Sequence, residues 1–206
     1  YPLDVDGEGD AISLAEARTR TFARRKIFIV STPTISGASA IEREYVASDQ
    51  RRYFVPCPHC SHRQWLRFEH LRWEKGEPET AAYVCESCDE PIAEHHKTWM
   101  LEHGEWRAMV PENGIKTAGF HLSSLYSPVG WRSWRDIAAA WESAVNKESG
   151  SAAAIKTFKN TELGETWVEE GDFARVVFAF DVLRNRFHRP RAIQGNHGVY
   201  VVNGRR

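Results

Sequence analysis

The sequence predicts a protein of the mixed α/β class, and three observations lead to that class. Four consecutive apolar residues at 27–30 lie between two stretches with helix-forming features. Further along, apolar residues recur with the period of an amphipathic helix from Trp134 to Val145. Between these segments, short strand-like runs surround four cysteines. The 206 residues are 42% hydrophobic and 27% charged, a globular composition in a chain long enough to bury a core.

The charge is balanced overall but unevenly distributed along the chain. The formal net charge of −1 excludes a wholly basic nucleic-acid binder. Residues 1–16 carry five acids and no base, whereas six arginines and no acid follow Asp181. No apolar run approaches the roughly 18–20 residues that cross a membrane. The first residues lack a methionine and a secretory leader, so we expect a chain that begins part-way through a longer protein.

The N-terminal region predicts helix, strand, helix. Ser13 and Glu16 match a capping box, which predicts a helix over about residues 14–25. The next segment, 26–33, holds the apolar run and stops at Ser-Thr-Pro, as expected for a strand buried on both faces of a parallel sheet. Residues 39–49 then predict a short helix.

The middle of the chain predicts short strands and turns. Residues 64–68 and 81–85 read as strands, and the charged segment 74–79 between them reads as a turn. A helix is expected over 94–102, and the Gly- and Pro-containing stretch 104–130 is expected to be mostly irregular.

Two helices are expected in the C-terminal half. Trp134, Ile137, Ala138, Trp141 and Val145 form one stripe of the first, with Ser133 as its N-cap. The second is expected over 152–160. An apolar stretch at 176–182 precedes a basic tail without clear periodicity.

Two C-x₂-C motifs, Cys57-Pro-His-Cys60 and Cys85-Glu-Ser-Cys88, predict a metal site. Each such turn lets two thiolates approach one cation, and two turns complete the four-sulfur shell that Zn²⁺ favours. The neighbouring strand-like segments then indicate a zinc ribbon. Because four thiolates close the shell, the zinc is expected to be structural rather than catalytic.

Disulfide bonds or four unrelated thiols are the alternatives to zinc. No extracellular feature supports disulfides, and paired C-x₂-C motifs in a cytosolic chain favour metal. Nearby histidines are expected to lie outside the metal shell, because four cysteines already fill it. These histidines are His59, His62, His95 and His96.

Ser31, Thr32 and Thr34 follow the apolar run at 27–30, where open α/β sheets place ligand-binding groups. A plain strand-to-loop turn is the alternative. The sequence contains no G-x-x-x-x-G-K-[ST] phosphate loop, no G-x-G-x-x-G and no H-E-x-x-H. The alternating acids between Asp4 and Asp10 do not match a calcium loop and are expected to be a solvated loop.

Several stretches in this order resemble the GpA-type large terminase subunits of tailed bacteriophages, the motors that package DNA. They are Ser13–Phe22, Arg25–Thr34, Arg51–Cys60, Ala118–Pro128, Trp131–Trp134 and Lys156–Trp167. The resemblance covers about residues 1–170. It implies a P-loop ATPase followed by a metal-dependent nuclease, with the phosphate loop and the acidic Mg²⁺-binding strand of the ATPase lying outside this sequence.

The resemblance implies a division of the chain into four parts. These are the C-terminal part of an ATPase domain at 1–50, a zinc ribbon at 51–92, a helical connector at 93–171 and a divergent basic tail at 172–206. As an isolated piece the fold would be α+β, with a partial P-loop sheet. Ser31, Thr32 and Thr34 match the motif thought to couple nucleotide state to DNA movement. Asp181 is a candidate nuclease metal ligand, although the residues after it depart from the family pattern.

The same resemblance implies cofactors and partners. ATP and Mg²⁺ are implied for the full-length protein, together with double-stranded DNA, a small terminase subunit and the portal of the prohead. The location implied is the host cytoplasm, with no membrane partner. The piece itself is expected to be inactive alone.

Two other functions stay open at this point. A free-standing zinc ribbon could bind nucleic acid, with Arg51, Arg52, Arg63 and Arg67 on phosphates and neighbouring aromatic rings on bases. These aromatics could equally be the core of the ribbon, with the arginines as its solvated rim. An assembly module could instead dock through the tryptophan-rich segment 131–141, although such a stripe is more often core.

Overall fold

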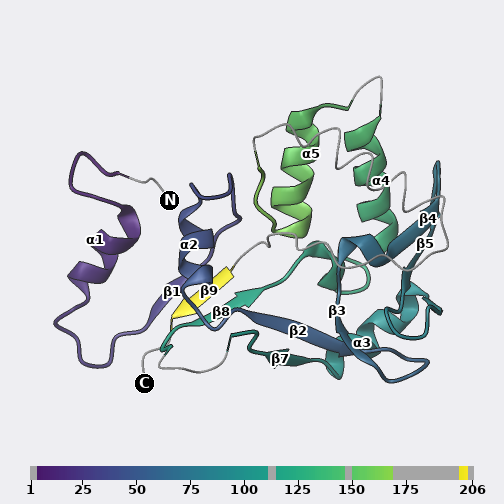
Figure 1. Ribbon diagram of the computed structural model, residues 1–206, viewed down its shortest axis with the longest axis horizontal. Coiled ribbons are helices and arrows are strands. Elements are labelled where there is room, and N and C mark those ends of the chain that lie inside the picture. Colours follow the sequence, from purple (N-terminus) through teal and green to yellow (C-terminus); the bar gives the residue numbers. More distant parts are fainter. Residues whose placement is uncertain (1–3, 111–114, 147–149, 169–199, 204–206) are drawn as a thin grey trace.

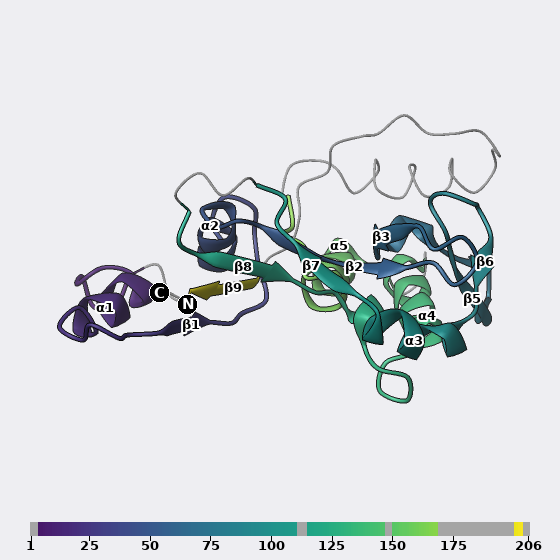
Figure 2. The same cartoon turned by 90° about the horizontal axis from the view of Figure 1, so that it is seen from below.

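The computed structural model describes residues 4–110, 115–146 and 150–168, and the backbone of 200–203. Short helices and two small sheets alternate along these residues, which confirms the mixed α/β class (Figure 1). Figure 2 shows an elongated molecule in which helix α1 (Ala11–Arg18) lies at one end and strands β5 (Glu77–Val84) and β6 (Pro91–Ile92) lie at the other. Among the described residues, no helix is long and apolar enough to cross a membrane.

The larger sheet connects the two halves of the molecule. Its order is β1-β9-β8-β2-β3, and β7 also pairs with β2. The pairs are antiparallel except β2 with β8, which are parallel. The strands are β1 (Ile27–Ile29), β2 (Arg51–Pro56), β3 (Arg63–Trp65), β7 (Glu105–Arg107), β8 (Ala118–His121) and β9 (Tyr200–Asn203).

The smaller sheet is antiparallel, in the order β4-β5-β6. It consists of β4 (Leu71–Glu74), β5 (Glu77–Val84) and β6 (Pro91–Ile92). The charged turn expected at 74–79 is tighter than predicted, because only Lys75 and Gly76 separate the two strands. Gly76 has a φ of +81°, a left-handed conformation that glycine adopts readily.

Helix α1 begins earlier than the capping-box pattern predicts. Asp10 is its N-cap, and the carboxylate accepts hydrogen bonds from the amides of Ile12 and Ser13 at 3.0 and 3.2 Å. The Ser13 hydroxyl donates to the same carboxylate and therefore does not cap the helix. The helix ends at Arg18, not near residue 25, and the Thr19 hydroxyl donates to the Glu16 carbonyl at that end.

Strand β1 is not buried on both faces, as its apolar run predicted. Ile29 is buried, but Phe28 and Val30 are 70% and 52% exposed. The strand pairs antiparallel with β9, not parallel. One face of β1 therefore packs on a small core with Ile12, Ile41 and Tyr45, while alternate side chains point to solvent because successive residues of a strand face opposite sides.

Helix α2 (Ala40–Val46) supports that small core, and α3 (Lys97–Glu102) follows a 3₁₀ turn at Glu94–His96. The stretch expected to be irregular, 104–130, contains β7, β8 and a 3₁₀ turn at Ser124–Tyr126. Both β7 and β8 form hydrogen-bonded pairs with β2, so they become strands although the sequence of 104–130 has no clear strand pattern.

Helix α4 (Trp134–Val145) confirms the amphipathic stripe and its predicted cap. Ser133 and Asp136 form a complete capping box, and Trp134, Ile137 and Trp141 are buried. Helix α5 (Ala152–Phe158) lies beside α4 (Figure 1) and continues into a π-helical turn, Lys159–Leu163. Gly164 ends that turn with a φ of +64°.

The small sheet and the 3₁₀ turn before it, Phe68–His70, pack on α4 and α5 through aromatic rings. Phe68 lies 5.2 Å from Trp141 and 5.1 Å from Phe158 between ring centroids. Tyr83 of β5 lies 5.8 Å from Trp134. The cysteine-bearing hairpins and the helices therefore share one hydrophobic core.

Candidate metal centre

The four cysteine sulfurs meet between two hairpins. Cys57 and Cys60 lie in the turn from β2 to β3, and Cys85 and Cys88 lie in the turn from β5 to β6. All four Sγ atoms lie within 4.8 Å of one another. Across the hairpins, Cys57 Sγ is 3.9 Å from Cys88 Sγ, and Cys60 Sγ is 3.7 Å from Cys85 Sγ. Four Zn–S bonds of about 2.3 Å in a tetrahedron require S···S edges of about 3.8 Å, so the donor set and its spacing fit a tetrahedral zinc ion.

The first cysteine turn is held by its own backbone. The Cys57 amide donates to the His62 carbonyl at 2.8 Å, and the Ser61 amide donates to the Cys57 carbonyl at 2.9 Å. Ser61, four residues after Cys57, has a φ of +62°. That left-handed residue turns the chain back into β3, so that the carbonyl of His62 meets the amide of Cys57.

The second cysteine turn repeats this geometry. The Cys85 amide donates to the Glu90 carbonyl and the Asp89 amide donates to the Cys85 carbonyl, both at 3.1 Å. Asp89, again four residues after the first cysteine, has a φ of +57°. The two turns are thus related by an approximate local symmetry, which the C-x₂-C spacing alone does not reveal.

Backbone amides also approach the sulfurs. The amides of His59 and Ser87 lie 3.4 Å from the Sγ atoms of Cys57 and Cys85. Hydrogen bonding from the His62 backbone lowers the pKa of the exposed Cys60 thiol to about 7. Burial instead raises the pKa of Cys85 to about 12. A bound cation would favour the thiolate form of every ligand, because the metal binds the deprotonated sulfur.

Gln64 and Glu86 join the two turns behind the sulfurs. Gln64 is fully buried on β3, and its side-chain oxygen accepts the Glu86 amide at 2.8 Å. The Glu86 carboxylate accepts a hydrogen bond from the Arg67 guanidinium at 2.6 Å and one from the His62 ring at 3.0 Å. These contacts fix one hairpin against the other. Nothing in the spacing of the sequence marks Gln64 for this position.

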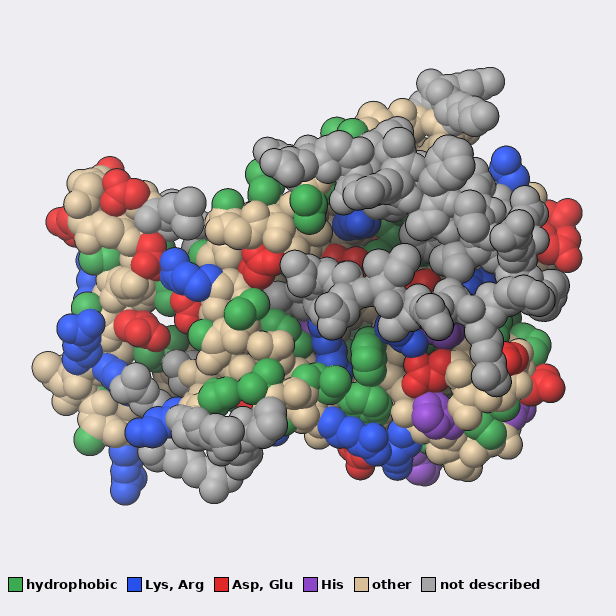
Figure 3. Space-filling view, viewed as in Figure 1, with side chains coloured by type: hydrophobic (Ala, Val, Ile, Leu, Met, Phe, Trp, Pro, Cys, Tyr) green, Lys and Arg blue, Asp and Glu red, His purple; other side chains and the backbone are tan. Residues whose placement is uncertain are grey.

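The histidines near the cysteines have other neighbours. His59 Nε2 lies 3.3 Å from the Pro91 carbonyl oxygen, and the rings of His95 and His96 lie 4.0 Å apart between centroids. Within the described ranges, one cluster of potential metal ligands is close enough to hold an ion. It consists of the four cysteines and includes no histidine. Histidine side chains gather at the end of the molecule where α3 lies (Figure 3).

Two of the four candidate nucleic-acid arginines lie on β2. Arg51 Nε donates to the Asp49 carboxylate at 2.7 Å. Arg52 is buried, and its guanidinium donates to His121 Nδ1. Because Nδ1 accepts, the proton of this imidazole is on Nε2, which lies 3.1 Å from the Leu163 carbonyl oxygen.

The other two arginines lie beside the first cysteine turn. Arg63 donates to the His103 carbonyl at 3.0 Å. Arg67 pairs with Glu69 and Glu86 at 3.2 and 2.6 Å. Figure 3 shows acidic and basic side chains mixed over the face it presents. The structure thus gives each candidate arginine a partner within the chain.

The hydroxyl-bearing turn after β1 contacts the C-terminal part of the described chain. Ser31 Oγ donates to the Thr32 carbonyl at 3.1 Å. The Thr34 carbonyl accepts the Trp167 amide at 2.9 Å and the Asn160 side-chain amide at 3.1 Å. Sequence reasoning singled out Thr34 but not these two partners.

Two acidic candidates remain, the loop that begins at Asp4 and the residue Asp181. Asp4 accepts the amides of Gly7 and Gly9, both at 3.1 Å, so the acidic loop is held by its own backbone. Asp181, the candidate nuclease ligand, lies outside the described residues.

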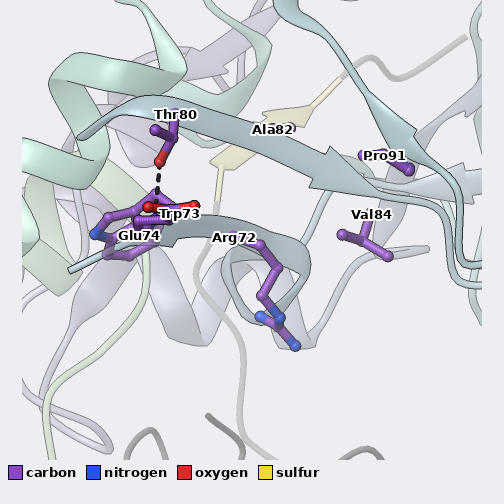
Figure 4. Close-up of a pocket in the computed structure, with 7 residues that line it drawn as sticks. All are labelled: Arg72, Trp73, Glu74, Thr80, Ala82, Val84 and Pro91. Atoms are coloured by element: carbon purple, nitrogen blue, oxygen red, sulfur yellow. Dashed lines mark hydrogen bonds between the residues drawn. The ribbon is translucent and has the colours of Figure 1, made fainter. Parts of the chain in front are cut away.

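A shallow depression of about 270 Å³ lies on the outer surface of the small sheet. Figure 4 shows Arg72, Trp73, Glu74, Thr80, Ala82, Val84 and Pro91 around it. The hydrogen bond from the Glu74 amide to the Thr80 hydroxyl, 2.8 Å long, joins β4 to β5 there. The depression contains none of the candidate site residues.

Comparison with known proteins gives two family matches and two curated relatives. Residues 1–106 match the ATPase domain of the phage terminase large subunit gpA, and residues 117–193 match the endonuclease domain of the terminase large subunit gpA. The large terminase subunit of Enterobacteria phage P21 is 32% identical in an alignment 194 residues long, and the match covers 82% of this chain. That of Escherichia phage lambda is 29% identical in an alignment 190 residues long, and the match covers 80% of this chain.

The chain is much shorter than these relatives. It spans 29% of the phage P21 protein and 28% of the phage lambda protein. No solved structure matches the chain. The consecutive matches to both gpA domains and the identity to two phage subunits agree with each other, and the chain belongs to the GpA family of phage terminase large subunits.

Proposed function

We propose that this chain is the middle portion of a viral DNA-packaging motor, and that it is inactive alone. The two consecutive domain matches, to the ATPase and then the endonuclease, carry this proposal. The parent activity would be ATP-driven packaging of double-stranded DNA with endonuclease cleavage, using ATP and Mg²⁺. The chain contains no G-x-x-x-x-G-K-[ST] loop to cradle the phosphates of ATP.

We assign a proposed role to each of four segments of the chain. Residues 1–50 would belong to the ATPase sheet, 51–92 would form a zinc ribbon, 93–171 would connect toward the nuclease, and 172–206 would be a divergent basic tail. Within the first segment, Ser31, Thr32 and Thr34 would be the motif that couples nucleotide state to DNA movement.

We infer that the cysteine centre binds one structural zinc ion through Cys57, Cys60, Cys85 and Cys88. The support is the four-sulfur donor set, with cross-hairpin spacings of 3.7 and 3.9 Å. A closed four-thiolate shell leaves no position for substrate, so the ion would act by joining the hairpin β2–β3 to the hairpin β5–β6. The ribbon would then be fixed on α4 and α5.

ATP turnover by the purified chain tests the proposal that it is inactive alone. We expect none above the level of a buffer blank, with or without Mg²⁺ and DNA. Turnover that persists after repeated purification would overturn that part of the proposal. Fusion to the N-terminal part of the phage P21 subunit is the positive arm, in which we expect turnover to appear.

A free-standing nucleic-acid-binding ribbon is the second candidate function. A ladder of rings and guanidinium groups favours it: Arg107 lies 4.8 Å from the Phe54 ring centroid, Phe54 lies 5.4 Å from Trp65, and Arg67 lies 5.1 Å from Trp65. The acidic partners of Arg63 and Arg67 argue against it, because they already neutralise the guanidinium charge.

Salt dependence of DNA binding separates the two functions. The six tail arginines would be replaced by glutamine, so that they cannot supply the phosphate contacts. If the ribbon binds DNA, the affinity of this variant should still fall steeply with salt, and Arg63→Gln and Arg67→Gln should each reduce the slope by about one. A flat salt dependence would remove this candidate.

An assembly role in the host cytoplasm, toward the small terminase subunit or the portal, is the third candidate. Its structural support is Trp131, which is 84% exposed in the loop before α4. Trp134 and Trp141 are buried, so the helix itself offers no tryptophan for docking. A Trp131→Ala variant that keeps its fold but loses capture by a small terminase subunit would support this role.

A further inference from the structure

Two segments far apart in the sequence form a short hydrogen-bonded joint. Ile35 and Trp167 make a parallel bridge. The Trp167 amide donates to the Thr34 carbonyl at 2.9 Å, and the Ser36 amide donates to the Trp167 carbonyl at 2.8 Å. The turn that ends β1 is thereby held against the last described residues before the C-terminal tail. The first side belongs to the ATPase match and the second to the endonuclease match.

Asn160 adds a side-chain bond to the same carbonyl. Its amide nitrogen donates to the Thr34 oxygen at 3.1 Å, and the residue is 8% exposed. The π-helical turn at Lys159–Leu163 places Asn160 there. π-Helical turns are rare in proteins overall, and those that occur are often found at functional sites. Among the described residues, the Asn160 Oδ1 atom has no hydrogen-bond partner, so the donor of this side chain is the group that makes contact.

Glu42 of α2 ties the two segments a second time. One carboxylate oxygen accepts the Ser36 hydroxyl at 3.3 Å and the Thr166 hydroxyl at 3.2 Å. The other accepts the Gly37 amide at 2.8 Å. A single carboxylate thus bonds to both sides of the joint. The joint is polar and directional, unlike the apolar packing elsewhere in the core.

We propose that this joint transmits displacement of the turn at 31–36 to the segment 160–167, with Asn160 as the positioning residue. This rests on the proposed coupling role of that turn. Hydrogen bonds weaken steeply with distance and angle. A shift of the Thr34 carbonyl by about 1 Å would therefore break its bonds to Asn160 and Trp167 together, so either the second segment follows the turn or the joint opens.

Hydrogen exchange of the full 206-residue chain, measured residue by residue, tests the joint from its C-terminal side. Asn160→Leu removes the donor and also the unpartnered oxygen, so the fold should persist. We expect the Ser36 amide to exchange about five- to tenfold faster, the size that loss of one hydrogen bond produces. The control is Thr161→Ala, one residue away, whose hydroxyl bonds to Thr157 within its own helix.

The second variant tests the joint from its N-terminal side. The Ser39 hydroxyl accepts the Thr34 amide at 3.3 Å and makes no cap bond to α2. We expect Ser39→Ala to raise exchange at Trp167 by a similar factor, because coupling between two sites is reciprocal. Thr19→Ala is the control, since the Thr19 hydroxyl bonds to the Glu16 carbonyl at the end of α1, outside the joint.

Faster exchange on the opposite side in both variants would support the joint. If either variant folds and its exchange rates change only on the substituted side of the joint, the proposal is overturned, even if the other variant fails to fold. Metal content and ATP turnover do not enter this test. Its failure is therefore distinguishable from failure of the proposed packaging role.

Discussion

The Sγ atoms of Cys60 and Cys85 lie 3.7 Å apart, although the two residues belong to different hairpins. Without a cation, thiolates at this distance would repel one another. With a cation, the same approach joins β2–β3 to β5–β6. The first prediction concerns this contact, because it couples metal binding to the stability of the fold.

We expect Cys60→Ser to abolish zinc binding and to lower the thermal midpoint by at least about 10 °C. Structural zinc contributes folding free energy directly, and a three-sulfur shell is incomplete. Differential scanning calorimetry with and without a chelator measures the effect. Ser87→Ala lies between the second pair of cysteines and is the matched control, which should behave as the parent chain. Equal midpoints for both variants would contradict the prediction.

The left-handed residues of the cysteine turns give the second prediction. Ser61 and Asp89 have φ values of +62° and +57°. A β-branched residue is strained there, whereas glycine is not. We expect Ser61→Val to destabilise the protein by about 1–2 kcal/mol relative to Ser61→Gly, measured by urea unfolding. The same pair of substitutions at Ser87 is the control, and an equal difference there would sink the argument.

The third prediction concerns pH. Burial raises the pKa of Glu165 to about 7 from an ordinary value of 4.5. Between those values the folded state binds more protons than the unfolded state, so stability should fall as pH rises from about 4.5 to about 7. One pKa unit corresponds to about 1.4 kcal/mol, which limits the total to about 3 kcal/mol.

Glu165→Gln should remove that slope and make the protein more stable above pH 7. The measurement is the free energy of unfolding at several pH values between 4.5 and 8. Glu102→Gln, an exposed substitution on α3, is the control and should keep the slope. A slope unchanged in Glu165→Gln would show that other groups cause it.

The fourth prediction concerns Lys97, which has no exposed surface. Its ammonium pairs with Glu94 at 2.5 Å and lies 5.1 Å from the Trp134 ring centroid. Glu94 also accepts the Trp134 amide at the start of α4, at 3.0 Å. We expect Lys97→Ala to cost about 3 kcal/mol, because it leaves a cavity and an unpaired carboxylate.

Lys97→Met should cost less than Lys97→Ala, since methionine fills much of the lysine volume without its charge. Urea unfolding of both variants compares them. Equal losses would mean that the ion pair, not packing, accounts for the destabilisation. Lys75→Ala, at the exposed turn between β4 and β5, should change stability by less than about 0.5 kcal/mol.

Local patterns predicted those features that depend on local chemistry. The two C-x₂-C motifs bring their sulfurs together, and Ser133 caps α4 as its position before the apolar stripe indicated. Both depend on residues within a few positions of each other. The helix at 14–25 was wrong because the Asp10 carboxylate, further upstream, captures the first amides of α1.

Local sequence patterns could not predict the features that depend on contacts between distant residues. Exposure of Phe28 depends on which strands flank β1, and no local period specifies them. Gln64 and Asn160 are ordinary polar residues in the sequence, and only the fold places them against Glu86 and Thr34. The same holds for β7 and β8, which form because β2 supplies backbone partners.

Native mass spectrometry of the purified chain, with free-thiol counting after denaturation, tests the central claim most directly. We predict one zinc ion per chain and four free thiols once the metal is removed. A folded chain that carries no metal, or one whose cysteines are paired as disulfides, would contradict the zinc-joined hairpins on which this account of the terminase segment rests.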